Sequence, residues 1–179
     1  MDNPQAAETT VSKIKGPEGA QNISLGPKFL CGLKGDVKMN IFHKDDQTVI
    51  YPCGHNIVIY NTEDKSQKYI PGIEGSEGIT ALAVSPTKRY MAICEKSERA
   101  ICRVVDLNSP NFGKKKILTS TDYNSKEFVS CAFSAINEKS LLVTLTAEPD
   151  IKVIIWTWDK AKCFTFQQVG GVSGSMSCT

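Results

Sequence analysis

Short apolar runs alternate with short polar turns along most of this chain, and the alternation is clearest in its middle. The first run ends at a Ser-Pro pair, where proline removes a backbone donor and stops a strand. The pattern predicts three consecutive strands joined by hairpin turns. The predicted strands are Ile79–Val84, Tyr90–Cys94 and Ala100–Leu107, and the polar turns between them are Thr87–Arg89 and Glu95–Arg99.

The same order of segments occurs twice more, upstream from Lys38 to Asn61 and downstream from Phe128 to Asp159. When His43, Ser85 and Ser134 are aligned, the units are offset by 42 and 49 residues. Repeats of about 40–45 residues that contain several short strands are typical of WD-type β-propeller blades, and the larger offset leaves room for an insertion. Three units in register are a stronger signal than any one of them.

The ends of the units and the segments after them complete the repeat. The third unit ends in Trp158-Asp159, like a WD repeat, whereas the second has Val105-Asp106 and the first has Tyr60-Asn61. An outer strand is expected after each unit, at Gln67–Ile70, Lys114–Leu118 and Cys163–Val169. The predicted fold class is therefore all-β: a partial WD-repeat β-propeller of about three four-stranded antiparallel blades, near residues 34–70, 79–118 and 128–169.

The two ends of the chain lack this pattern. Residues 1–27 are predicted to form a flexible arm, and residues 170–179 a flexible Gly/Ser-rich tail. The apolar stretch Lys28–Leu33 is a candidate first strand. Because propellers typically close with about 4–8 blades, we expect either a short form or fragment of a longer protein, or an array that other chains complete.

Composition narrows the class of protein. Hydrophobic residues make up 41% of the 179 residues, which is sufficient for a packed core. The net charge is +2, so the charge balance does not favour nucleic acid or an anionic membrane as a partner. The sequence has no apolar run near the roughly 18 residues of a membrane span and no secretory signal pattern, so we expect an intracellular protein.

Cysteine and tryptophan positions are interpreted as packing. The seven cysteines are odd in number and include no C-x-x-C pair, which favours neither a disulfide framework nor a zinc site. Cys94, Cys102 and Cys131 lie in apolar runs, where a free thiol behaves as a small buried hydrophobe. Trp156 and Trp158 are expected to face opposite sides of one strand, with one in the core and the other against a neighbouring blade or a partner.

The sequence contains no recognisable catalytic constellation. The two histidines, His43 and His55, have no nucleophile or second metal ligand at a suitable spacing. Asp45-Asp46 lacks the rest of a calcium-binding loop. We therefore expect a non-enzymatic protein without a cofactor or metal, whose loops and edges bind other proteins.

Two sets of charged residues are candidates for protein binding. Three consecutive lysines lie on an expected outer strand, where lysine commonly guards an edge against unwanted pairing; alternatively, they form a basic patch for an acidic partner. The hairpin turns supply the second set. The candidates are Lys114, Lys115 and Lys116 on the strand, and Asp45, Lys88 and Glu138 in the turns.

Several stretches resemble the axonemal WD-repeat family of cilia and flagella. The most specific are the YPCG and QKYIPG elements, and the likeness extends over roughly residues 33–169. The stretches that carry it are Tyr51–Gly54, Gln67–Gly72, Ala81–Pro86, Arg89–Ile93, Lys126–Ser134 and Trp156–Lys160.

The resemblance implies a non-catalytic structural protein of the cytoplasm, cytoskeleton and ciliary or flagellar axoneme. Members of that family have two tandem propellers and a long coiled coil, lie along doublet microtubules, and help to position inner dynein arms near the regulatory complex. The implied partners are dynein-arm or regulatory-complex subunits and tubulin, with no nucleic acid and no membrane. The alternative is a cytosolic WD-repeat adaptor for the assembly of protein complexes.

Overall fold

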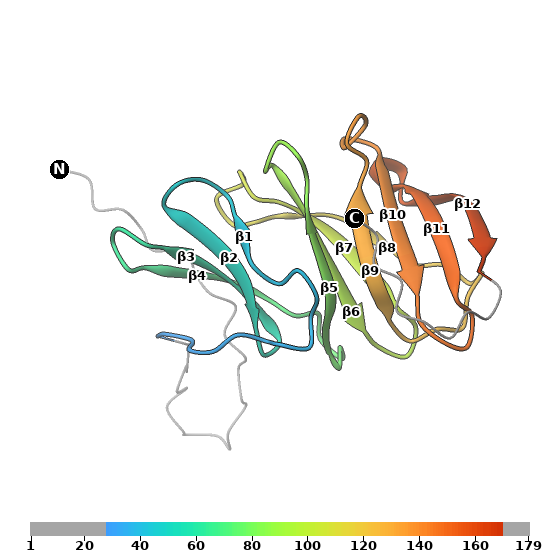
Figure 1. Cartoon of the computed structure of the whole chain (residues 1–179), viewed down its shortest axis with the longest axis horizontal. Helices are drawn as coiled ribbons and strands as arrows, with labels where there is room; N and C mark the ends of the chain where they lie inside the picture. The colour runs from blue at the N-terminus through green and yellow to red at the C-terminus, as the bar shows by residue number, and fades with distance from the viewer. Residues whose placement is uncertain (1–27, 170–179) are drawn as a thin grey trace, which may run out of the picture.

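The computed structural model describes residues 28–169, which form three four-stranded antiparallel sheets side by side (Figure 1). Blade 1 consists of β1 (Phe42–His43), β2 (Thr48–Cys53), β3 (Asn56–Asn61) and β4 (Gln67–Pro71). Blade 2 consists of β5 (Gly78–Val84), β6 (Tyr90–Lys96), β7 (Ile101–Asp106) and β8 (Lys114–Leu118). Blade 3 consists of β9 (Phe128–Phe133), β10 (Leu141–Thr146), β11 (Lys152–Thr157) and β12 (Lys162–Gln168), with a 3-10 turn, η1 (Trp158–Lys160), before β12. The all-β fold class predicted from the sequence is confirmed.

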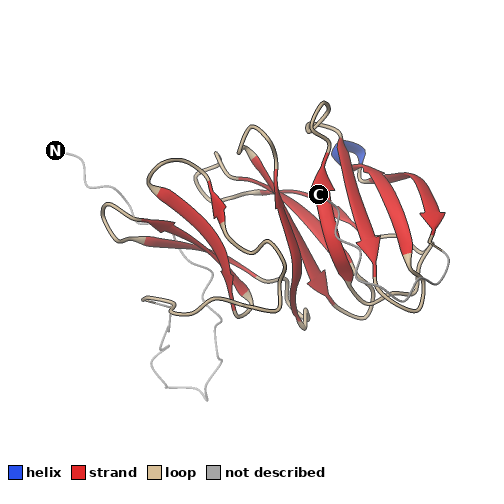
Figure 2. Cartoon of the chain, viewed as in Figure 1, coloured by secondary structure: helices blue, strands red, loops and turns tan. Residues whose placement is uncertain are grey.

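Each blade is a simple meander in which every strand pairs with the next along the chain (Figure 2). Short polar turns can make these connections because adjacent antiparallel strands need only a hairpin. The crossover from blade 1 to blade 2 is a longer segment that includes Gly75, with a φ of 80°, and ends at Gly78, with a φ of 146°. Residues with a side chain rarely adopt these angles, so glycine is the residue type that suits this crossover.

Blade 2 is buried on both faces because its successive side chains belong to two different hydrophobic clusters. Ala92 and Cys94 of β6 pack in the cluster shared with blade 3, whereas Met91 and Ile93 pack in the cluster shared with blade 1. A strand sends alternate side chains to opposite faces, so a sheet that is covered on both faces requires a continuous apolar run. This requirement explains why the middle repeat shows the clearest apolar pattern.

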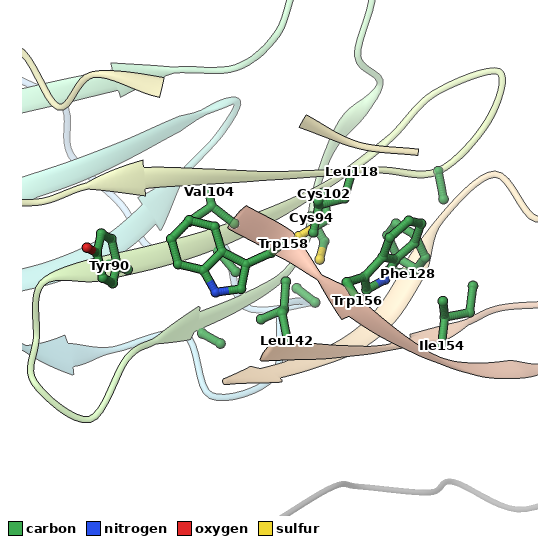
Figure 3. Packing of buried hydrophobic residues seen from close by; sticks show 14 of the residues in the cluster. Tyr90, Cys94, Cys102, Val104, Leu118, Phe128, Leu142, Ile154, Trp156 and Trp158 are labelled. Atoms are coloured by element: carbon green, nitrogen blue, oxygen red, sulfur yellow. The ribbon is translucent and has the colours of Figure 1, made fainter. Parts of the chain in front are cut away.

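The junction between blades 2 and 3 packs several small side chains of blade 2, together with Tyr90, Val104 and Leu118, against large side chains of blade 3 (Figure 3). The contributions of blade 2 include Ala81, Ala83, Ala92, Cys94 and Cys102, and those of blade 3 include Phe128, Leu142, Trp156 and Trp158. The buried Cys94 and Cys102 confirm the packing role predicted for these free thiols, and Cys131 is half-buried beside them.

Both tryptophans lie in this one cluster, so the expectation that they face opposite sides is wrong. Trp156 is 0% exposed and Trp158 is 4% exposed. Residues two positions apart share a face of a strand, and Trp158 in fact belongs to η1. Each indole N–H has a hydrogen-bond acceptor: Trp156 Nε1 donates to Thr144 Oγ1 at 2.8 Å, and Trp158 Nε1 donates to the carbonyl of Glu138 at 2.8 Å.

Two further expectations need correction. Residues 28–33 form no strand; instead, Leu30 N–H donates to Gln67 Oε1 at 2.8 Å, and Gln67 Nε2 donates to Leu30 O at 3.0 Å. A side-chain amide thus holds this segment against β4 without a strand ladder. The turn expected from Glu95 begins later, because Glu95 and Lys96 are the last residues of β6. The predicted flexible arm, 1–27, and tail, 170–179, lie outside the described residues.

Candidate docking surfaces

Three hairpin turns, one from each blade, lie at the same rim of the molecule, the upper one in Figure 1. They connect β1 to β2, β5 to β6 and β9 to β10, and they carry Asp45, Lys88 and Glu138, respectively. We call this edge the hairpin rim. Asp45 and Lys88 are exposed there, whereas Glu138 is buried. The fold therefore brings the three predicted turn residues to one rim but gives them different environments.

The exposed charges on the hairpin rim are held by tight backbone geometry. Asp45 Oδ1 accepts the Gln47 N–H at 3.0 Å, and a hydrogen bond from the Thr48 side chain is the main cause that lowers the pKa of Asp45. Lys88 has a φ of 59°, and its N–H donates to Ser85 O at 2.8 Å. Both charged residues are thus carried on short, internally bonded turns.

Glu138 joins blade 3 to blade 2. Its carboxylate accepts the Thr87 N–H at 2.9 Å and also the Thr87 hydroxyl, while its carbonyl accepts the Trp158 indole N–H. Desolvation opposes ionisation of this side chain, but the hydrogen bonds from Thr87 and Ser85 and the charge of Lys139 together lower the pKa of Glu138. The structure therefore gives Glu138 a contact within the chain that the sequence did not indicate.

The three lysines lie on the outermost strand of blade 2. Lys114, Lys115 and Lys116 open β8, which pairs only with β7 and leaves its other edge unpaired within the described sheet. Lys116 is exposed, opposite Val104 of β7. This position fits both interpretations of the lysines, as guards of an open edge and as a basic docking patch.

A buried ion pair lies at the junction of blades 1 and 2. Arg103 Nε is 2.7 Å from Glu95 Oε1, and the two side chains are 8% and 0% exposed. The second Glu95 oxygen accepts the Ile73 N–H at 2.8 Å, and Arg103 Nη2 donates to Pro71 O at 2.5 Å. Desolvation lowers the pKa of Arg103, and the neighbouring Glu95 carboxylate opposes that shift. The pair fixes the crossover between the blades.

A cavity of about 700 Å³ opens at the rim opposite the hairpin rim, where the starts of β5 and β9 come together. We call it the inner cavity. Residues 34, 36 and 38 form one wall; residues 77–80 and Lys96 of blade 2 form the second. Residues 127, 129, 145–148, 151 and 169 of blade 3 form the third. Asp45, Lys88, Lys116 and Glu138, which were predicted from the sequence as site residues, do not line this cavity.

Sequence reasoning missed the ion pair and the inner cavity for different reasons. Arg103 interrupts an apolar run, and a charge within a run that becomes a doubly covered strand is a signal for a buried pair. Glu95 gives no such signal, because it opens the polar stretch Glu95–Arg99. The cavity gives no such signal, because its walls come from segments far apart in the chain. Only the packing of the blades brings those segments together.

Within residues 28–169, no group of three or more His, Cys, Asp or Glu side chains is arranged to hold a metal ion. No helix in the same range is long and apolar enough to cross a membrane.

The repeats and the fold together define a class of protein, the WD-type β-propeller proteins, of which the described residues form a partial array. No protein-family model matches the chain. Cilia- and flagella-associated protein 57 of Mus musculus is 39% identical over 132 residues, which cover 73% of this chain and 10% of the mouse protein.

Two other relatives are also named as cilia- and flagella-associated proteins. Cilia- and flagella-associated protein 57 C of Tetrahymena thermophila is 33% identical over 150 residues, 80% of this chain and 11% of that protein. Cilia- and flagella-associated protein 44 of Mus musculus is 30% identical over 121 residues, 68% of this chain and 6% of that protein. The chain belongs to the cilia- and flagella-associated protein 57 family. It matches only about a tenth of the length of the two relatives of that name.

Proposed function

We propose that this chain is a non-catalytic scaffold of motile cilia and flagella that binds other axonemal proteins. The observation that carries the proposal is the 39% identity, over 73% of the chain, to a protein named for its association with cilia and flagella. The fold suits a scaffold, because three blades share two continuous hydrophobic clusters and present short, fixed turns. A rigid platform loses little conformational freedom when a partner binds.

The finer proposal places the partners near the inner dynein arms and the regulatory complex on doublet microtubules. It rests on the resemblance to axonemal WD-repeat proteins. Asp45 and Lys88 are the proposed contacts on the hairpin rim, and Lys114, Lys115 and Lys116 are the proposed contacts on β8. Glu138 would act on the same rim by holding the turn that carries Lys88, since it bonds to the adjacent Thr87.

Expression of a tagged full-length chain in ciliated cells tests this proposal. We expect the chain to remain with detergent-extracted axonemes, and the double variant D45N/K88M to bind less because both exposed rim charges are lost. The control variant, E98Q/K126M, also removes one charge of each sign from exposed positions, but at the opposite rim. Equal retention of the unmodified chain, D45N/K88M and E98Q/K126M on the axoneme would contradict a role for the hairpin rim.

The cytosolic adaptor is the competing proposal, and the same fractions distinguish it. An adaptor would leave the axoneme on detergent extraction and would co-purify from the soluble fraction with a stable non-axonemal partner. Recovery of the chain only in that soluble fraction would contradict the axonemal proposal.

A further inference from the structure

We propose that the inner cavity binds a basic, extended segment of a partner protein. Its volume, about 700 Å³, lies within the roughly 300–1,000 Å³ that is typical of pockets that bind ligands. Blades 2 and 3 and the segment before β1 contribute to its walls, so a segment bound there would contact parts of the chain that are distant in sequence. This inference does not depend on the ciliary role, because it follows from the cavity alone.

The charges around the inner cavity divide into paired and unpaired groups. Lys34 Nζ lies 2.7 Å from Asp36 Oδ2, and Lys96 Nζ lies 3.4 Å from Glu77 Oε2. These two ion pairs occupy the walls formed by blade 2 and by the segment before blade 1. The wall formed by blade 3 has no lysine or arginine to offset its own acidic residues.

The blade 3 wall instead carries two carboxylates, those of Glu127 and Glu148. Neither has an ion pair or a side-chain hydrogen bond with any residue in the described part of the chain. The backbone beside them is fixed, since the Ala147 N–H donates to Glu127 O at 3.0 Å. Glu127 is half-buried and Glu148 is exposed. Two unpaired carboxylates on one wall attract cationic side chains, and solvent screens the half-buried Glu127 less than a fully exposed group.

The remaining surface of the inner cavity is apolar. Ile79 and Leu145 are buried in its floor, and Val129 is 40% exposed at the wall that also carries Glu127. Thr80 lines the same space, and its buried hydroxyl has no hydrogen-bond partner among the described residues. An apolar floor beside two anionic groups fits a segment that alternates basic and apolar side chains, because an extended chain directs successive side chains to opposite faces.

The opposite choice of ligand, an acidic segment, fits less well. Lys38 is the only lysine lining the cavity that has no ion pair among the described residues, whereas two carboxylates are unpaired. An acidic segment would meet those carboxylates with like charge, which costs binding free energy. A basic segment would pair with them and could present a backbone carbonyl to Lys38.

Fluorescence anisotropy with the purified full chain tests the proposal. The probe is a short fluorescein-labelled peptide in which lysine and valine alternate, and the comparison peptide has glutamate in place of every lysine. The test variant is E127Q/E148Q, which removes both unpaired carboxylates. The matched control is E63Q/E98Q, which changes the net charge equally at exposed positions that do not line the cavity.

We expect the lysine peptide to bind, and E127Q/E148Q to bind it about tenfold more weakly, which corresponds to the loss of two modest ion pairs. The control should differ from the unmodified chain by less than about twofold, and added salt should weaken binding. The proposal is overturned if the lysine peptide does not bind, or if both variants weaken its binding equally. It is also overturned if the glutamate peptide binds as tightly as the lysine peptide. Circular dichroism of each variant establishes that it remains folded.

Discussion

The buried ion pair between Glu95 and Arg103 allows a quantitative prediction. Replacement of Arg103 by methionine keeps much of the side-chain volume but leaves the Glu95 carboxylate, which is 0% exposed, without its cationic partner. The Ile73 N–H remains as a hydrogen-bond donor to that carboxylate, and Pro71 O loses the donor it had. The change therefore isolates a buried negative charge at the junction of two blades.

The expected cost follows from this burial. Removal of one partner of a buried ion pair typically destabilises a protein by about 3–5 kcal/mol, a large share of the roughly 5–15 kcal/mol that holds a domain folded. At the usual dependence on urea, about 1–3 kcal/mol per M, R103M should lower the urea midpoint by roughly 1–5 M. The double variant E95L/R103M should be less destabilised than R103M, because no charge remains buried. It shares with R103M the loss of the donor to Pro71 O, and its added penalty is the unpaired Ile73 N–H, at about 1–3 kcal/mol.

Urea unfolding followed by tryptophan fluorescence measures these differences, since Trp156 and Trp158 are both buried in the folded chain. The control is K96M, which removes the partner of Glu77 in a wider ion pair, 3.4 Å, whose two side chains are 41% and 56% exposed. Such a pair contributes about 1 kcal/mol or less. The reasoning is refuted if R103M costs no more than K96M, or if E95L/R103M is less stable than R103M alone.

Three further predictions concern other contacts of the fold. E138Q should lose about 1–2 kcal/mol, because the Thr87 donors then face a neutral amide. The folded chain lowers the pKa of Glu138, so the ionised side chain stabilises the fold above its pKa in the unfolded chain, and this stabilisation is lost as the pH falls through its pKa in the folded chain. The melting temperatures of E138Q and of the unmodified chain should therefore converge as the pH is lowered. A difference in melting temperature that stays constant with pH would contradict this reasoning. W158F should cost about 1–3 kcal/mol in urea titrations, because it removes the hydrogen bond to Glu138 O and part of the contact with Tyr90, whose ring centroid is 5.0 Å away. Alkylation mapped by mass spectrometry should modify the exposed Cys31 before Cys94 and Cys102, since burial excludes reagent and raises the pKa of Cys94; simultaneous modification would contradict the packing described.

The repeat pattern alone predicted the architecture because it depends on local rules. Alternating apolar runs and polar turns specified strands and hairpins, and three units in register specified three blades. The continuous apolar character of Ile79–Val84 and Tyr90–Cys94 reflected burial on both faces, which the structure confirms for β5 and β6. Such features are determined by side-chain polarity and strand geometry, which act over a few residues.

The contacts between blades were decided only by the tertiary structure. The placement of both tryptophans in one cluster, the bond of Glu138 to Thr87 and the pairing of Glu95 with Arg103 all depend on how strands from different parts of the chain meet. The inner cavity depends on the same packing, because Glu127 and Glu148 are ordinary polar residues until blades 2 and 3 and the segment before β1 form a cavity beside them. The sequence by itself determined the blades and their order, since local polarity encodes them. The structure decided which charges became buried, paired or left free, because that outcome depends on distances between segments that no local pattern encodes.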